Sequence, residues 1–392
     1  MSQTETMILN MGPQHPSTHG VLRLVLELDG ERVVDVRPDI GFLHSGIEKT
    51  GENRTYRQVL PYTDRMDYVS AHTHNLGYVL AVEKLLGIEA PARAQYIRVI
   101  MAELSRLAAH LIYWGTSALD LAGVSGVVLM YCFNEREKIL NLFEASAGSR
   151  MTPSYFRIGG LAADLPEGWV EEARGFIRQL PRELDRMERI LTRNPVFMDR
   201  TVGIGKLSAA DALAYGITGP SLRATGVRYD VRKVMPYSGY DQFDFEVPTQ
   251  TAGDVYARYL VRVAEMRQSI RIIEQALSRL PCGPINVGDR KIVLPPRAEL
   301  DTSMEALIHQ FKLITEGFHP PVGQVWQTVE ASKGELGYYL VSDGGPRPYR
   351  FRVRAPSFAA VQVLPLLCRG HMLADVVAII GSLDLVMGEV DR

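Results

Sequence analysis

The sequence feature that most constrains the fold is an apolar periodicity of helical type that recurs through the middle of the chain. Between residues 94 and 115, for example, Ile97, Ile100, Leu104 and Leu107 follow one another at intervals of three or four. Such spacing puts the apolar side chains on one face of an α-helix, and that face has to be buried against a neighbour. The same pattern marks five segments: 65–87, 94–115, 135–147, 167–193 and 254–280. The sequence therefore predicts a bundle of helices at the centre of the protein.

A strand pattern precedes these helices. Every second residue from Leu22 to Leu28 is leucine, and Asp29-Gly30 separates this run from a second apolar run at 33–36. Alternation of this kind is typical of a strand with one buried face, and an Asp-Gly pair favours a type I′ turn. We therefore expect a β-hairpin near the N-terminus.

A second alternating stretch lies at 325–353 and is interrupted by glycine-containing turns at 333–334 and 343–345, which favours a small antiparallel sheet. Further helices are expected at 304–316 and 372–381, from the spacing of their apolar residues. The predicted fold class is thus mainly α (α+β), a helical bundle with small antiparallel β-sheets near the N-terminus and in the C-terminal third.

A chain of 392 residues exceeds what one hydrophobic core usually serves, so we expect interlocked subdomains. Residues 1–60 should form the hairpin and loop region, and residues 61–290 the helical core. Residues 291–392 should form a small sheet and a C-terminal helix packed on that core. Within the core, 200–253 is rich in glycine and aromatic residues but lacks periodicity, so it is predicted to form long ordered loops around the bundle.

Composition excludes several classes of protein. Hydrophobic residues make up 46% and charged residues 22%, which is typical of a folded chain, and a net charge of −2 argues against a nucleic-acid partner. The chain contains no run of 18 apolar residues and no signal-like N-terminus, from which we expect a cytosolic address. Cys132, Cys282 and Cys368 lie far apart with no C-x-x-C pair, so each is expected to be a small buried hydrophobe rather than a metal ligand.

Common cofactor motifs are also missing. The sequence has neither a G-x-G-x-x-G nor a P-loop, so any NADH should bind elsewhere, and it has no H-E-x-x-H. We therefore predict that the chain itself holds no metal and no flavin. His72 and His74 are two residues apart on an expected helix and should point in different directions, into the core or to the surface.

Three polar residues stand out as candidates for chemistry. His19 lies in the loop 12–20, where two prolines and two glycines exclude a helix; Tyr68 lies at an expected helix start; Asp120 sits among leucines and alanines. Each also has a structural explanation, as a turn cap, a core tyrosine or a helix cap. A carboxylate in the apolar setting of Asp120 needs a donor or a cation, and a histidine would serve. Without a family resemblance, the residues indicate only a mainly helical protein in which a pair of His and Asp is one option.

Residues 11–23, M-G-P-Q-H-P-S-T-H-G-V-L-R, closely resemble the opening signature of the 49 kDa subunit family of respiratory complex I. Further blocks agree in the same order: Y-D-V-R-K at 229–233, E-M-R at 265–267, T-E-G at 315–317, G-E-L-G-Y-Y at 334–339 and G-E-V-D-R at 388–392. The resemblance covers essentially the whole chain. It implies a fold like the large subunit of nickel-iron hydrogenases and a catalytic role in a proton-pumping NADH:quinone oxidoreductase.

The resemblance also implies a site and partners. In the family, a histidine at the position of His19 and a tyrosine at that of Tyr68 hold the two quinone carbonyls, while an aspartate at that of Asp120 pairs with the histidine. Quinone is then the substrate, and a partner subunit carries the terminal tetranuclear iron-sulfur cluster. The other expected partners are further subunits of the hydrophilic and membrane arms. The expected location is peripheral, at the cytoplasmic face of the inner membrane.

The sequence departs from the family pattern at two places. Thr152 stands where many members have a histidine near the cluster, so the pH dependence of the cluster's potential should be weaker. Residues 125–133 deviate from the aromatic-rich run of the family, which leaves the local shape of the quinone chamber open, with a loop insertion as one option.

Three alternative functions remain at this point. A nickel-iron hydrogenase needs two C-x-x-C pairs, but the matching stretch 382–388 contains no cysteine. A noncatalytic scaffold would have no need of His19, Tyr68 and Asp120 together. A related complex with a different electron donor stays open, because other subunits determine the donor.

Overall fold

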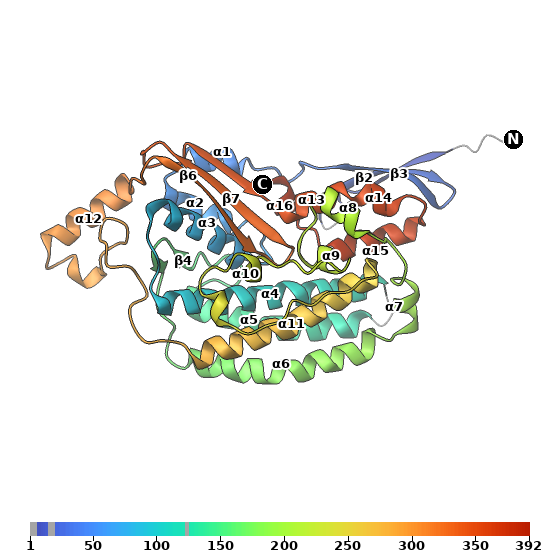
Figure 1. Cartoon of the computed structure of the whole chain (residues 1–392), viewed down its shortest axis with the longest axis horizontal. Helices are drawn as coiled ribbons and strands as arrows, with labels where there is room; N and C mark the ends of the chain where they lie inside the picture. Colours follow the sequence, from blue (N-terminus) through green and yellow to red (C-terminus); the bar gives the residue numbers. More distant parts are fainter. Residues whose placement is uncertain (1–5, 15–19, 122–124) are drawn as a thin grey trace.

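A computed structural model describes residues 6–14, 20–121 and 125–392. Four long helices form the lower layer in Figure 1, and the sheets and shorter helices lie over it. These helices are α4 (Ala92–Leu121), α5 (Ser125–Ala147), α6 (Trp169–Leu191) and α11 (Val255–Ser278). The predicted fold class is confirmed, because a helical bundle carries small antiparallel sheets near the N-terminus and in the C-terminal part.

Three helix boundaries differ clearly from the sequence prediction, and one of them is the end of α4, which lies at Leu121 instead of residue 115. Helix α3 (Ala71–Leu86) begins later than expected, because residues 65–70 form turns held by the carboxylate of Asp67. Helix α5 begins at Ser125 instead of residue 135, so residues 125–133 are helical and the option of a loop insertion there is excluded. Apolar residues that break a family pattern can still satisfy a helical period, which is what packing against α4 requires.

The N-terminal sheet has the strand order β1-β2-β3 and is antiparallel throughout. Its strands are β1 (Met7–Met11), β2 (Arg23–Asp29) and β3 (Arg32–Asp39). The leucines of β2 face the core, as predicted. The predicted type I′ turn is wrong, since it requires positive φ at both central residues and only Gly30, with φ of 61°, has it.

The C-terminal sheet is also antiparallel, with the order β6-β7-β8 and the predicted turn at 333–334. Its strands are β6 (Gly323–Glu330), β7 (Glu335–Ser342) and β8 (Arg350–Arg354). A short hairpin pairs β4 (Phe156–Arg157) with β5 (Gly160–Leu161). Helix α3 packs against both β6 and β7, so the sheet covers the bundle from above.

The remaining helices are short. Residues 200–253 contain only brief turns of helix, as the lack of periodicity predicted. These are α8 (Ala209–Ala214), α9 (Gly219–Arg223), α10 (Val231–Val234) and η2 (Tyr240–Gln242). Elsewhere lie α1 (Ile47–Glu52), α2 (Tyr56–Thr63), α7 (Pro195–Asp199), η3 (Arg297–Glu299), α12 (Met304–Thr315), α13 (Pro356–Gln362), α14 (Leu364–Cys368), α15 (Leu373–Leu383) and α16 (Met387–Asp391).

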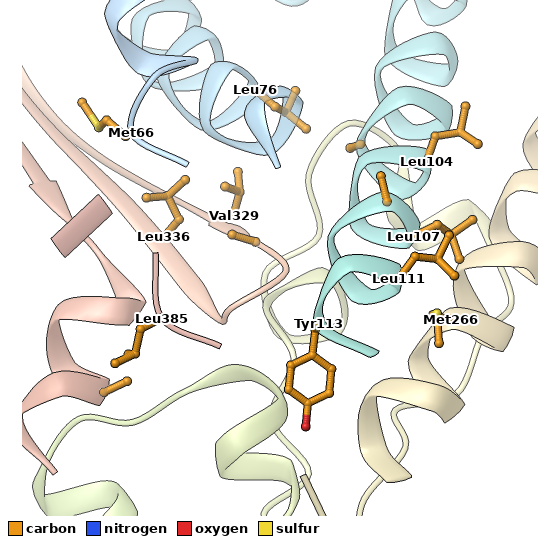
Figure 2. Close-up of a cluster of buried hydrophobic side chains, with 14 of the residues drawn as sticks. Met66, Leu76, Leu104, Leu107, Leu111, Tyr113, Met266, Val329, Leu336 and Leu385 are labelled. Atoms are coloured by element: carbon orange, nitrogen blue, oxygen red, sulfur yellow. The ribbon is translucent and has the colours of Figure 1, made fainter. Parts of the chain in front are cut away.

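The apolar core joins the bundle to the C-terminal sheet. Figure 2 shows Leu107 and Leu111 of α4 near Met266 of α11, with Val329 and Leu336 of the sheet on the other side. All five side chains are buried. Because one cluster draws on segments from across the chain, its burial stabilises the layers together.

The cysteines and histidines bear out the sequence prediction only in part. Cys132 and Cys368 are buried as expected, but Cys282 is exposed, since it follows the end of α11 in an irregular segment.

His72 is buried between the rings of Phe143 and Phe156, and burial lowers its pKa to about 3. No helix in the described part of the chain is both long and apolar enough to cross a membrane.

Buried charges tie the layers together. Arg232 of α10 contacts Asp230 at 2.6 Å and Glu103 of α4 at 3.0 Å, and all three side chains are almost fully buried. Glu103 also accepts hydrogen bonds from Tyr240 and Ser269. Although burial alone would raise the pKa of Glu103, the nearby guanidiniums lower it to about 2, so the carboxylate stays ionised.

A second group of buried charges continues this network. Arg223 of α9 contacts Glu265 of α11 at 2.6 Å and Glu330 of β6 at 2.8 Å. His110 of α4 lies 3.0 Å from the other oxygen of Glu265. Arg106, one turn before His110, donates hydrogen bonds to the carbonyls at the end of β6. The segment containing α9 and α10 is therefore fixed to the bundle by charge pairs in addition to its buried apolar residues, such as Leu222 and Val231.

Substitution of Arg232 by Met should destabilise the chain by about 3–5 kcal/mol, because it leaves the buried carboxylates of Asp230 and Glu103 without that cation. Arg178→Met on the exposed side of α6 is the matched control and should change stability by less than ~0.5 kcal/mol. Denaturant unfolding of the purified chains measures both. Equal stability of the two variants would show that this network contributes nothing to the fold.

Candidate functional site

Tyr68 lies in a tight turn between α2 and α3. Asp67, which is fully buried, accepts hydrogen bonds from the backbone N–H groups of Val69 and Ser70 at 3.1 and 3.2 Å. This turn directs the Tyr68 side chain outward, where it remains 37% exposed. The turn therefore presents a phenol that a small molecule can reach.

The buried side chain of Lys333 contacts the inner side of this turn. It lies at the β6–β7 turn and is buried, with its ammonium 3.3 Å from the Asp67 carboxylate. The carboxylate of Asp384 lies 4.0 Å from the same ammonium. Burial disfavours the charged ammonium, but the carboxylates outweigh it and raise the pKa of Lys333. A permanent positive charge thus lies below Tyr68.

The pKa of Tyr68 responds to these neighbours. Burial of part of the ring raises its pKa, the Asp67 carboxylate raises it further, and the Lys333 ammonium lowers it. The net shift is upward, so the phenol keeps its proton at neutral pH and can donate a hydrogen bond.

The C-terminal segment closes the site from below. The α-carbon of Gly388 approaches the Tyr68 turn so closely that a Cβ at this position would lie 2.7 Å from the carbonyl oxygen of Met66. The same hypothetical Cβ would lie 3.4 Å from the ring of Tyr68. Only glycine allows this approach, which is why the segment can pack against the turn.

Two carboxylates of this segment, Glu389 and Asp391, bind other parts of the chain. Glu389 is fully buried, lies 3.2 Å from Nε2 of His74 and accepts hydrogen bonds from the backbone and hydroxyl of Ser357. Asp391 accepts hydrogen bonds from the backbone N–H groups of Gly41 and Leu43 at 2.9 and 2.8 Å. The loop after β3 is thereby fastened beside the site.

The three residues predicted from the sequence have different outcomes. Tyr68 lies at the site just described, although in a turn rather than at a helix start. His19 lies outside the described residues. Asp120, near the end of α4, has an exposed side chain that makes no hydrogen bond or ion pair with another described residue. Partial burial raises the pKa of Asp120. Its predicted pairing with His19 stays a prediction.

Sequence reasoning missed Lys333, Asp384 and Glu389. Lys333-Gly334 indicated only a turn, and 382–388 was used only for its lack of cysteine. A signal was present, because Asp384 stands between two leucines and therefore had to be buried beside a cation. The distance in sequence between Asp67 and Lys333 concealed their pairing.

Thr152 is partly buried between α5 and β4, in the loop that also holds Ser154. Ser154 donates a hydrogen bond to the buried Asp64, and burial raises the pKa of this carboxyl to about 6. No group of three or more His, Cys, Asp or Glu side chains in the described ranges is arranged to hold a metal ion.

The helical fold agrees with the hydrogenase-like class of large subunits that the sequence predicted, and a family model supports this class. A family model described as nickel-dependent hydrogenase matches residues 45–138. A second model, described as the 49 kDa subunit of respiratory-chain NADH dehydrogenase, matches residues 122–392.

Relatives agree along the whole chain, and each of them is a D-type subunit of NADH-quinone oxidoreductase. The relative from Koribacter versatilis is 55% identical over 390 residues, which cover all of this chain and 97% of the relative. The relative from a Roseiflexus species is 57% identical over 393 residues, covering all of this chain and 94% of the relative. The relative from Geotalea uraniireducens is 53% identical over 392 residues, which cover both chains completely.

The chain belongs to the family of 49 kDa subunits of respiratory-chain NADH dehydrogenase. This confirms the resemblance inferred from residues 11–23 and the later blocks. It also confirms that the chain is a subunit of an oxidoreductase complex, and hence that other subunits of that complex are its partners.

Two variants test the electrostatics of the site. Asp67→Asn keeps an oxygen acceptor for the turn but removes the negative charge, so the pKa of Tyr68 should fall. Lys333→Met removes the positive charge, so the pKa of Tyr68 should rise. Alkaline titration of the Tyr68 ring by NMR measures both shifts, and Tyr68→Phe identifies the signal. An identical pKa in both variants and the parent chain would contradict this arrangement.

Proposed function

We propose that this chain is the quinone-binding catalytic subunit of a proton-pumping NADH:quinone oxidoreductase, and that Tyr68 holds the quinone headgroup. The observation that carries the proposal is the reachable phenol of Tyr68 above the buried Asp67–Lys333 pair. Family membership supplies the reaction class, and the names of the relatives supply quinone as the substrate. His19 is proposed to bind the second carbonyl oxygen.

The reaction explains why these residue types are needed. Two electrons and two protons convert a quinone to a quinol, and negative charge develops on the carbonyl oxygens before the protons arrive. A neutral phenol donates a hydrogen bond to one such oxygen and then transfers its proton when the oxygen has become strongly basic. The tyrosinate left behind is stabilised by the Lys333 ammonium below it.

His19 and Asp120 form the second half of the proposal. An imidazole titrates near neutral pH, so His19 can give a proton to the other quinone oxygen, and Asp120 favours the charged form of the imidazole. When His19 loses this proton, Asp120 loses its counter-charge. We propose that this change of charge signals to the proton-pumping part of the complex.

The electrons have to come from outside this chain. We propose that a partner subunit holds the terminal tetranuclear iron-sulfur cluster and that NADH is oxidised further along the complex. The partners then include this iron-sulfur subunit together with the other hydrophilic-arm and membrane-arm subunits. The same proposal places the chain peripherally at the cytoplasmic face of the inner membrane.

Removal of the Tyr68 hydroxyl tests the role of the phenol. In the intact complex, Tyr68→Phe should lower quinone reduction by roughly a hundredfold or more while the cluster is still reduced by NADH. Tyr349→Phe, at an exposed tyrosine of the same chain, is the matched control and should keep full activity. Steady-state turnover and the spectrum of the reduced cluster measure the two steps. Normal turnover of Tyr68→Phe would refute this site.

Removal of the Asp120 charge tests the proposed role of the His19–Asp120 pair. Asp120→Asn should leave assembly and quinone affinity largely intact but lower turnover, because His19 loses the anion that supports its charged form. The polypeptide composition of the purified complex, KM for quinone and kcat separate these effects. Unchanged kcat would remove Asp120 from the mechanism.

A further inference from the structure

A large basic cavity lies on the surface of the described part of the chain. It measures about 1170 Å³ and lies between α2, the β4–β5 hairpin, the irregular segment 284–297 and the end of α12. A second cavity of about 480 Å³ shares Gln58 and Pro61 with it, so the two form one groove. We call the combined feature the arginine groove.

The charge of the arginine groove is strongly unbalanced. Its lining contains six arginines, which are Arg54, Arg57, Arg65, Arg157, Arg290 and Arg297. Among the described residues, two carboxylates line it, Asp289 and Glu299, and Glu299 is already paired with Arg290 at 2.7 Å. The other five guanidiniums form no ion pair with a described residue. On a chain whose net charge is −2, this excess of positive charge is local.

Two of these arginines come from different walls of the larger cavity and repel each other. Arg57 of α2 is half-buried and donates a hydrogen bond to the carbonyl of Leu313 at 3.4 Å. Burial lowers the pKa of Arg57, and the guanidinium of Arg157 on β4 lowers it further. Holding two like charges in one cavity costs free energy, which an anion placed between them would offset.

One wall of the groove, segment 284–297, is already held in place by hydrogen bonds within this chain. Asn286 accepts a hydrogen bond from the backbone of Leu161 at 2.9 Å, and Val287 donates one to the carbonyl of Gly159 at 2.9 Å. Segment 284–297 is thereby fastened to the β4–β5 hairpin. A ligand entering the groove therefore has little chain to order, which favours tight binding.

An apolar helix face continues the groove. Helix α12 projects from the body of the molecule (Figure 1) and buries only Ala306 and Leu313. On its exposed side lie Met304, Leu307, Ile308, Phe311 and Ile314, of which Phe311 is 67% exposed. Ile314 also lines the larger cavity. An exposed apolar stripe of this kind is typical of a protein–protein interface.

We infer that the arginine groove and the exposed face of α12 together dock an acidic segment of another protein subunit, with its carboxylates between Arg57 and Arg157 and its apolar side chains on α12. A small free anion would leave most of this volume and the helix face unfilled. A flat lipid surface cannot enter a cavity walled on several sides. A nucleic acid would gain little from the apolar stripe, which lacks a row of aromatic rings for base stacking.

Photo-cross-linking in the assembled complex tests this docking. A photoreactive residue replacing Ile314 should cross-link to one segment of another subunit that contains Asp or Glu within a few residues. The same replacement at Leu213, a similarly exposed leucine of α8, is the control position and should not label that segment. Cross-links only to a second copy of this chain, to lipid, to nucleic acid or to a segment without carboxylates would overturn the inference.

Reversing the charge of Arg57 and Arg157 provides a second test of the docking. The combined change Arg57→Glu and Arg157→Glu should lower the yield of this cross-link about tenfold or more, whereas Arg178→Glu on α6 should leave it unchanged. The milder pair Arg57→Gln and Arg157→Gln should lower the yield by a smaller factor, and unchanged thermal unfolding shows that it still folds. Substituting Lys for the acidic residues of the labelled segment should restore the yield with the glutamate pair. A yield insensitive to all these changes would refute the role of the arginines, and it would leave the quinone proposal untouched.

Discussion

The structure depends on one buried interaction, the set of arginines and carboxylates that joins α4, α9, α10, α11 and β6. Removing charges from water is expensive, so such a network is stable only when each partner is present and well oriented. Arg223 alone meets carboxylates from α11 and β6, and it also donates to the backbone of Tyr229. The network therefore specifies one arrangement of segments that have little apolar periodicity of their own.

This network also determines where the candidate site lies. Arg106 donates hydrogen bonds to the carbonyls of Glu330 and Ala331 at 2.6 and 2.9 Å, which fixes the end of β6. The turn that follows carries Lys333 to the Asp67 carboxylate. A lysine 266 positions away from Asp67 in sequence can support Tyr68 because a buried guanidinium holds its turn in place.

Much of the fold could be predicted from periodicity. The long helices, the β2–β3 hairpin and the C-terminal sheet follow from spacing that the sequence displays, because amphipathic elements must bury one face, whereas strand β1 and the β4–β5 hairpin were not predicted. The failures are local. Helix α3 begins at Ala71 because Asp67 caps the preceding turn through hydrogen bonds that no periodicity reveals, and the turn at Gly30 depends on backbone angles. Cys282 is exposed because the helix before it has already ended.

The sequence by itself determined the helical bundle and the family and predicted Tyr68 as a site residue, since these rest on local patterns and on residue order. Only the tertiary structure decided which charges act on that tyrosine, because Lys333 joins Asp67 beside it from the far end of the chain and Asp384 lies next to the same ammonium. It also decided that the arginines of the groove lie together, since they come from α2, β4, η3 and the loops between elements. Coulombic interactions depend on distance in space and not on distance along the chain, so charges scattered in sequence acquire a common role only when the chain has folded.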